Sequence, residues 1–169
     1  MPDFDLRWAY AEPAQEEARF QAMLPAAAAA ADRAYHLGLL TQIARAQGLQ
    51  QRFADAHATL DQVEALVTDD LPTARIRLYL ERGRAFNSDR RRAEALPLFQ
   101  AAFDLAVAAG EAYHAVDAAH MVAIAIPDAA DQLAWNLKAV ALAEAYAEAR
   151  GWLGSLYNNI GWTYADGGR

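Results

Sequence analysis

Three side chains able to bind a metal or transfer a proton occur at intervals of three residues: His114, Asp117 and His120. Residues three or four apart are neighbours on a helix surface, so Asp117 can face either histidine. The two histidines are six residues apart, which places them about 240° apart around a helix axis, and they cannot face one ion. We therefore expect no metal site. Instead, His114 should pair with Asp117, and His120 should pack between helices.

Arginine is concentrated in one short stretch. Seven of the 15 basic residues lie within 75–92, against two acidic residues, so this stretch carries +5 in a chain of net charge -7. Arg77, Glu81, Arg84 and Ser88 fall at i, i+4, i+7 and i+11 and share one helix face. Two interpretations have equal support. Arg77 and Glu81 could simply pair on the surface, or the guanidinium groups could clamp a carboxylate, which their fork geometry matches.

Composition argues against several classes of function. The chain has no cysteine, which excludes disulfides, thiolate metal sites and a cysteine nucleophile. A net charge of -7 disfavours binding to a phosphate backbone. No apolar run is long enough to span a bilayer, and the acidic N-terminus does not resemble a secretory signal. We therefore expect a cytoplasmic protein that is not an enzyme, holds no cofactor, and binds neither nucleic acid nor membrane.

The secondary-structure elements that position these side chains are predicted to be helices along the whole chain. About a quarter of the residues are alanine, and apolar residues recur at i, i+3, i+4 and i+7 rather than in alternation. Turn-forming residues interrupt this pattern at short intervals: Gly48, Asp69–Asp70, Gly110, Pro127 and Gly151. Short turns force neighbouring helices to run antiparallel. The sequence thus predicts an all-α fold of about eight helices.

A small residue flanked by aromatics recurs along the chain. Gly83 follows Tyr79 by four residues and precedes Phe86 by three, and Gly161 has Tyr157 and Tyr164 at the same offsets. Ala95, Phe99 and Ala102 then follow Gly83 at offsets of 12, 16 and 19. A small residue on the inner face lets two helices approach closely, with aromatic rings filling the space around it.

This spacing resembles the tetratricopeptide repeat (TPR), a helix-turn-helix unit that stacks into a right-handed superhelix. The resemblance covers residues 34–169 and is best over 76–107; the spacing is longer than the usual period. It implies a cap or degenerate repeat over 1–33, repeats over 34–75, 76–112 and 113–153, and the first helix of an incomplete fourth repeat over 154–169.

In TPR proteins the first helix of each repeat lines a groove that binds peptides. By that resemblance, the groove here is lined by Arg77, Glu81, Arg84, Ser88, His114, Asp117, Met121, Ser155, Asn158, Asn159 and Trp162. Asparagine can hydrogen-bond an extended backbone with its donor and its acceptor. Trp162 lies off the apolar face of its helix and is a candidate anchor.

The resemblance implies a non-enzymatic scaffold that binds a peptide or helix of another protein, in particular an acidic or C-terminal segment. The alternative is a regulatory or sensor domain of a longer signalling or transcription-regulating chain. The last helix also carries a set of apolar residues without an evident partner: Trp152, Leu153, Leu156, Tyr157, Ile160 and Tyr164. A homodimer through this C-terminal helix is therefore a further expectation.

Overall fold

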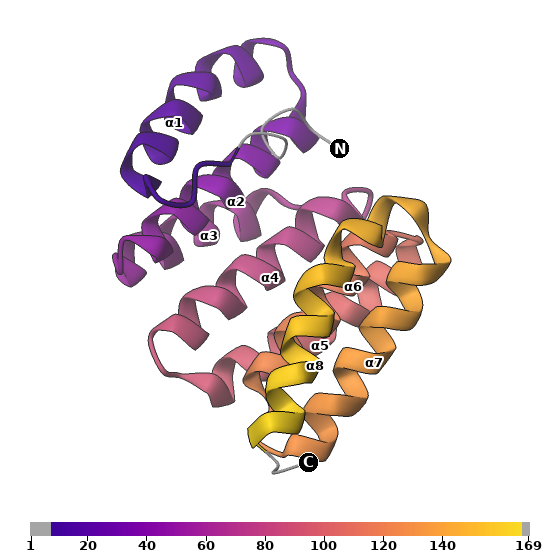
Figure 1. Cartoon of the computed structure of the whole chain (residues 1–169). Helices are drawn as coiled ribbons and strands as arrows, with labels where there is room; N and C mark the ends of the chain where they lie inside the picture. Colours follow the sequence, from indigo (N-terminus) through magenta and orange to yellow (C-terminus); the bar gives the residue numbers. More distant parts are fainter. Residues whose placement is uncertain (1–7, 167–169) are drawn as a thin grey trace.

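The structure, a computed structural model, describes residues 8–166, and every regular element in this part of the chain is helical (Figure 1). The prediction of an all-α helical repeat fold is confirmed. The elements are α1 (Pro13–Ala29), α2 (Arg33–Leu49), α3 (Phe53–Leu66), α4 (Pro72–Ser88), α5 (Arg92–Ala109), α6 (Ala112–Ala125), α7 (Ala129–Ala145), the 3-10 helix η2 (Ala147–Trp152) and α8 (Leu153–Asp166). The outermost residues of the predicted cap and fourth repeat, 1–7 and 167–169, lie outside the described residues. None of the described helices is long and apolar enough to cross a bilayer.

Each helix packs against the next one in the chain, which makes hairpins of α2–α3, α4–α5 and α6–α7 (Figure 1). In addition, α2 contacts α4, and α4 contacts α6. The first helices of the three hairpins therefore lie side by side. We call the surface formed by α2, α4 and α6 the inner face. The first residues of its neighbouring helices are 39 and 40 residues apart in sequence.

Helices α2, α4 and α5 end in the same kind of turn. A residue just beyond each helix has a positive φ: 61° at Gln51, 63° at Arg90 and 72° at Gly110. The amide of the next residue then donates to a carbonyl oxygen five residues back, at 2.8 to 3.0 Å. This is the Schellman arrangement, which closes a helix end with backbone groups alone. Of the predicted glycine breaks, Gly110 takes this role, whereas Gly48 and Gly151 lie within α2 and η2.

Within residues 8–166 the core consists of three apolar clusters, and some partly buried residues pack against two of them. The first cluster joins α1 to α4, the second joins α4 to α7, and the third joins α6, α7, η2 and α8. Tyr79 packs against both the first and the second cluster. Phe103, Trp135 and Leu142 pack against both the second and the third. The apolar interior is thus continuous from one end of the stack to the other.

The 3-10 helix η2 changes how the last helix is seated. It separates α7 from α8 and packs on both of them and on α6. Leu156 of α8 is fully buried in the third cluster, but Tyr157 and Tyr164 stay 53% and 42% exposed. Part of the apolar set that was predicted to be uncovered is therefore buried by packing within the chain, and the other part stays exposed.

Candidate functional site

The inner face carries an ion-pair network that crosses three helices. Arg84 of α4 bonds to Glu81 on its own helix, at 2.6 Å, and to Asp117 of α6. Arg45 of α2 reaches the same Glu81 oxygen at 3.3 Å. Glu81 and Asp117 are buried, with 4% and 5% exposure. Two positive and two negative side chains therefore balance within this network.

The network holds Arg84 and Asp117 in their charged forms. Burial by itself would lower the pKa of Arg84, but Asp117 and Glu81 outweigh it and raise that pKa above its ordinary value. Burial would likewise raise the pKa of Asp117, yet Arg84 and Arg45 lower it on balance. A buried charge is tolerated when such partners surround it. Any incoming carboxylate would have to compete with Glu81 and Asp117 for these arginines.

A second polar group lies at the start of α6. Thr73 of α4 donates to Glu111 at 2.6 Å, and His114 contacts the other oxygen of Glu111 at 3.2 Å. The bond with His114 outweighs burial and, with the Thr73 hydroxyl, lowers the pKa of Glu111 to about 2. His114 is thus engaged with Glu111 rather than with Asp117, the partner expected from spacing alone.

The segment that precedes α1 folds back onto the inner face. The indole Nε1 of Trp8 donates to Gln42 of α2 at 2.8 Å, and its ring stacks on Tyr10 at 5.0 Å and packs on Phe20 at 5.4 Å. The guanidinium of Arg45 lies over both rings, 5.7 Å from Trp8 and 5.4 Å from Tyr10. Residues 8–12 are not helical. The inner face thus holds a non-helical segment of its own chain.

Two cavities on the inner face meet at Tyr10, Arg45 and Glu81. The smaller, which we call the polar cavity, has about 60 Å³ and is closed on one side by Trp152 of η2. The larger, the Met121 cavity, has about 200 Å³. Its apolar walls are Ala44, Leu49, Ala85 and Met121.

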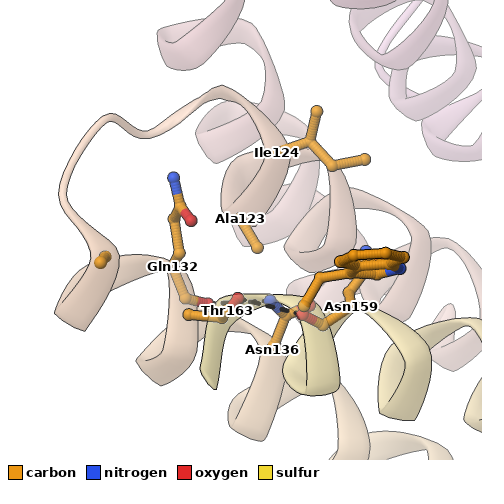
Figure 2. A pocket seen from close by; sticks show the side chains of 8 residues that line it. Ala123, Ile124, Gln132, Asn136, Asn159 and Thr163 are labelled. Atoms are coloured by element: carbon orange, nitrogen blue, oxygen red, sulfur yellow. Dashed lines mark hydrogen bonds between the residues drawn. The ribbon is translucent and has the colours of Figure 1, made fainter. Parts of the chain in front are cut away.

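A third space, the amide pocket, lies where α8 passes the turn between α6 and α7. It has about 300 Å³ and is lined by Ala123, Ile124, Ala129, Gln132, Asn136, Asn159, Trp162 and Thr163. Figure 2 shows Ile124 at its upper edge and Asn136, Asn159 and Thr163 along its lower edge. Leu156, one turn before Asn159, anchors α8 in the core, while the following turns border this pocket.

Nine of the eleven predicted groove residues line at least one of these three spaces. Arg77, Glu81, His114 and Asp117 line the polar cavity, and Glu81, Arg84, Ser88 and Met121 line the Met121 cavity. Asn159 and Trp162 line the amide pocket. Ser155 and Asn158 are exposed on α8 and line none of these three spaces.

The three side chains considered as metal ligands contact different partners. His114 contacts Glu111, Asp117 contacts Arg84, and His120 lies 3.2 Å from the amide nitrogen of Asn159. Burial, only partly opposed by Asp117, lowers the pKa of His120. Within residues 8–166, no group of three or more metal-binding side chains is placed to hold an ion.

Sequence reasoning missed several of the lining residues. Trp8 and Tyr10 precede the first helix, and nothing in helical periodicity connects them with α2. Gln132 and Asn136 are four residues apart on α7, a second helix, where the repeat pattern predicts packing rather than binding. The available signal was a pair of amides on the helix face that otherwise carries alanine and valine.

Comparison of the chain with protein-family models, with curated proteins and with solved structures finds no match. The resemblance to the TPR family therefore stays a prediction from residue spacing. What the chain does has to be inferred from its own geometry.

Proposed function

We propose that this protein is a non-enzymatic interaction scaffold whose inner face binds a peptide or helix of another protein. The observation that carries this proposal is that the inner face already receives a non-helical segment of its own chain. Trp8 is held there by a hydrogen bond to Gln42 and by the guanidinium of Arg45, which lies over its ring. Aromatic packing combined with a polar contact is the usual means of holding a peptide on a surface.

The Met121 cavity favours a partner segment that carries an apolar side chain. Leu49 and Met121 contribute to its apolar walls, and Leu49 is 47% exposed. Arg45 and Arg84 also border this cavity, but both are committed to Glu81, and Arg84 is committed to Asp117 as well. An acidic or C-terminal segment would gain less from these arginines than from free ones, since they are already neutralised.

Peptide selection tests the proposal. The full chain is used as bait for a displayed library of random peptides, and the affinity of an enriched peptide is measured by calorimetry. We expect Leu49→Glu to weaken binding about tenfold or more, because a charge beside the cavity must be desolvated.

Leu137→Glu is the matched control, since Leu137 is 50% exposed on α7 and lines none of the three spaces. It should change the affinity by less than about twofold. The proposal fails if no peptide is enriched, or if the two variants lose affinity equally.

A further inference from the structure

The amide pocket contains a hydrogen-bond acceptor that the protein itself leaves unused. Asn136 is 2% exposed, and its Oδ1 has no hydrogen-bond partner. Its Nδ2, by contrast, donates to the carbonyl oxygen of Gln132 at 3.1 Å. Buried polar atoms in folded proteins nearly always have a partner. Asn136 lines the pocket, but its Oδ1 has less than 1 Å² of accessible surface, so the side chain has to turn for this acceptor to meet a ligand that brings an N–H or O–H donor.

The other walls specify a neutral ligand. None of the eight lining residues is acidic or basic, so a charged ligand would lose its hydration without meeting an opposite charge. Ala123, Ile124 and Ala129 supply apolar surface. Trp162, which is 64% exposed, offers an indole face. A suitable ligand combines a hydrogen-bond donor with an aliphatic group.

The size of the pocket limits how much of a ligand it can enclose. Its volume of about 300 Å³ is at the low end of ligand pockets, which range from about 300 to 1,000 Å³. This is room for about one or two residues of a peptide. A peptide residue has the required composition, because its backbone amide is neutral and donates while its side chain can be aliphatic.

We propose that the amide pocket binds an uncharged peptide segment, with a backbone N–H donating to Asn136 Oδ1 and an aliphatic side chain against Trp162. The inference rests on the proposed function in that the ligand is a peptide. It concerns a separate place, however, since the amide pocket shares no lining residue with either cavity of the inner face.

Capped tripeptides provide the probes. The first has the sequence alanine-leucine-alanine, the second has N-methylated leucine, and the third has aspartate in place of leucine. Each is titrated into the isotopically labelled full chain, and the side-chain amide signal of Asn136 and the indole signal of Trp162 are followed by NMR. We expect saturable shifts with the leucine peptide. The N-methylated and aspartate peptides should bind about tenfold more weakly or not at all.

Two variants and one control then locate the site. Asn136→Leu removes the acceptor at similar side-chain volume, and Trp162→Ala removes an exposed ring, so both variants should fold. Each variant should bind the leucine peptide about tenfold more weakly. Tyr157→Ala, a change at another exposed aromatic of α8, should leave its affinity unchanged. The inference is overturned if the leucine peptide gives no saturable shift, if the aspartate peptide binds equally well, or if Asn136→Leu binds like the wild type.

The two proposals can fail separately. Leu49→Glu should leave binding of the leucine tripeptide unchanged, because Leu49 lines the Met121 cavity and not the amide pocket. If Leu49→Glu abolishes tripeptide binding while Asn136→Leu preserves it, the amide pocket is refuted and the inner-face proposal stands. If the tripeptide binds normally but no peptide is selected on the inner face, the inner-face proposal is refuted and the amide-pocket proposal stands.

Discussion

Gly83 is the residue where the packing of the repeat leaves no room for a side chain. A Cβ built on Gly83 would lie 2.5 Å from Cε1 and 2.8 Å from Cδ1 of Phe99, whose ring is fully buried. Gly161 occupies the corresponding offset between two aromatics, yet a Cβ there would meet nothing within 4 Å. The same local pattern thus occurs in two environments: Gly83 is covered by the following helix, whereas Gly161 is open.

This difference predicts opposite effects of the same substitution. Gly83→Ala should lower the free energy of unfolding by up to about 2 kcal/mol, since overpacking costs about 1–3 kcal/mol and the gain in helix propensity is about 1 kcal/mol. Gly161→Ala should raise it by about 0.5–1 kcal/mol, because only the propensity changes. Urea unfolding followed by circular dichroism measures both. Equal stabilities would mean that the Phe99 ring can move aside.

At the scale of elements, the ends of the helices depend on the left-handed residue that follows them. Gly110 adopts φ 72° after α5 without strain, whereas Gln51 and Arg90 adopt φ 61° and 63° with a Cβ present. For a residue with a Cβ, the left-handed conformation costs roughly 1–2 kcal/mol. Ala31, after α1, adopts φ 54° in the same way, so within the described residues the chain accepts some strain at three turns and keeps these connections short.

Replacing Arg90 with glycine should relieve that strain. We expect Arg90→Gly to raise the free energy of unfolding by about 0.5–1 kcal/mol, the strain relief being offset in part by the flexibility that glycine adds to the unfolded chain. Gly110→Ala, the reverse change in the same kind of turn, should lower it by about 1 kcal/mol. Thermal unfolding of the two variants provides the measurement, and destabilisation by Arg90→Gly would contradict the argument.

At the scale of the whole molecule, neighbouring hairpins stabilise each other through side chains that pack against two clusters. Phe103 of α5 contacts the Trp135 ring edge-on, with centroids 5.1 Å apart, and Lys138 lies over both rings. Because Phe103 packs against both the second and the third cluster, it couples α8 and η2 to the rest of the stack. In stacked helical repeats such nearest-neighbour contacts determine whether the array unfolds as one unit.

Phe103→Ala should therefore uncouple the C-terminal part. Three of the four tryptophans, Trp135, Trp152 and Trp162, lie in α7, η2 and α8. In the wild type, urea transitions followed by tryptophan fluorescence and by circular dichroism should coincide. Phe103→Ala should lower the free energy of unfolding by about 2–3 kcal/mol, since Phe103 is partly buried. In this variant the fluorescence transition should occur at a lower urea concentration than the circular dichroism transition.

Val107→Ala is the control for this experiment, since Val107 is 52% exposed on the same helix. Its two transitions should still coincide. If they also coincide in Phe103→Ala, coupling between the second and third clusters does not depend on Phe103.

The sequence by itself determined the helices, their approximate ends and the close contact at Gly83. These features are local, because helical periodicity, turn residues and the spacing of small and aromatic side chains act over a few turns. The resemblance to TPR proteins further predicted that Arg77, Glu81, Arg84 and Asp117 lie on first helices that share one groove. In the structure these residues lie on α4 and α6, which contact each other.

Only the tertiary structure decided which side chains pair and where space remains. Arg84 is shared with Asp117, 33 residues away, and Trp8 bonds to Gln42, 34 residues away. The amide pocket lies where α8 passes the turn between α6 and α7, so its lining combines residues of three helices. Such contacts depend on how each helix is translated and rotated against its neighbours, and a repeating pattern of residue types does not encode those movements.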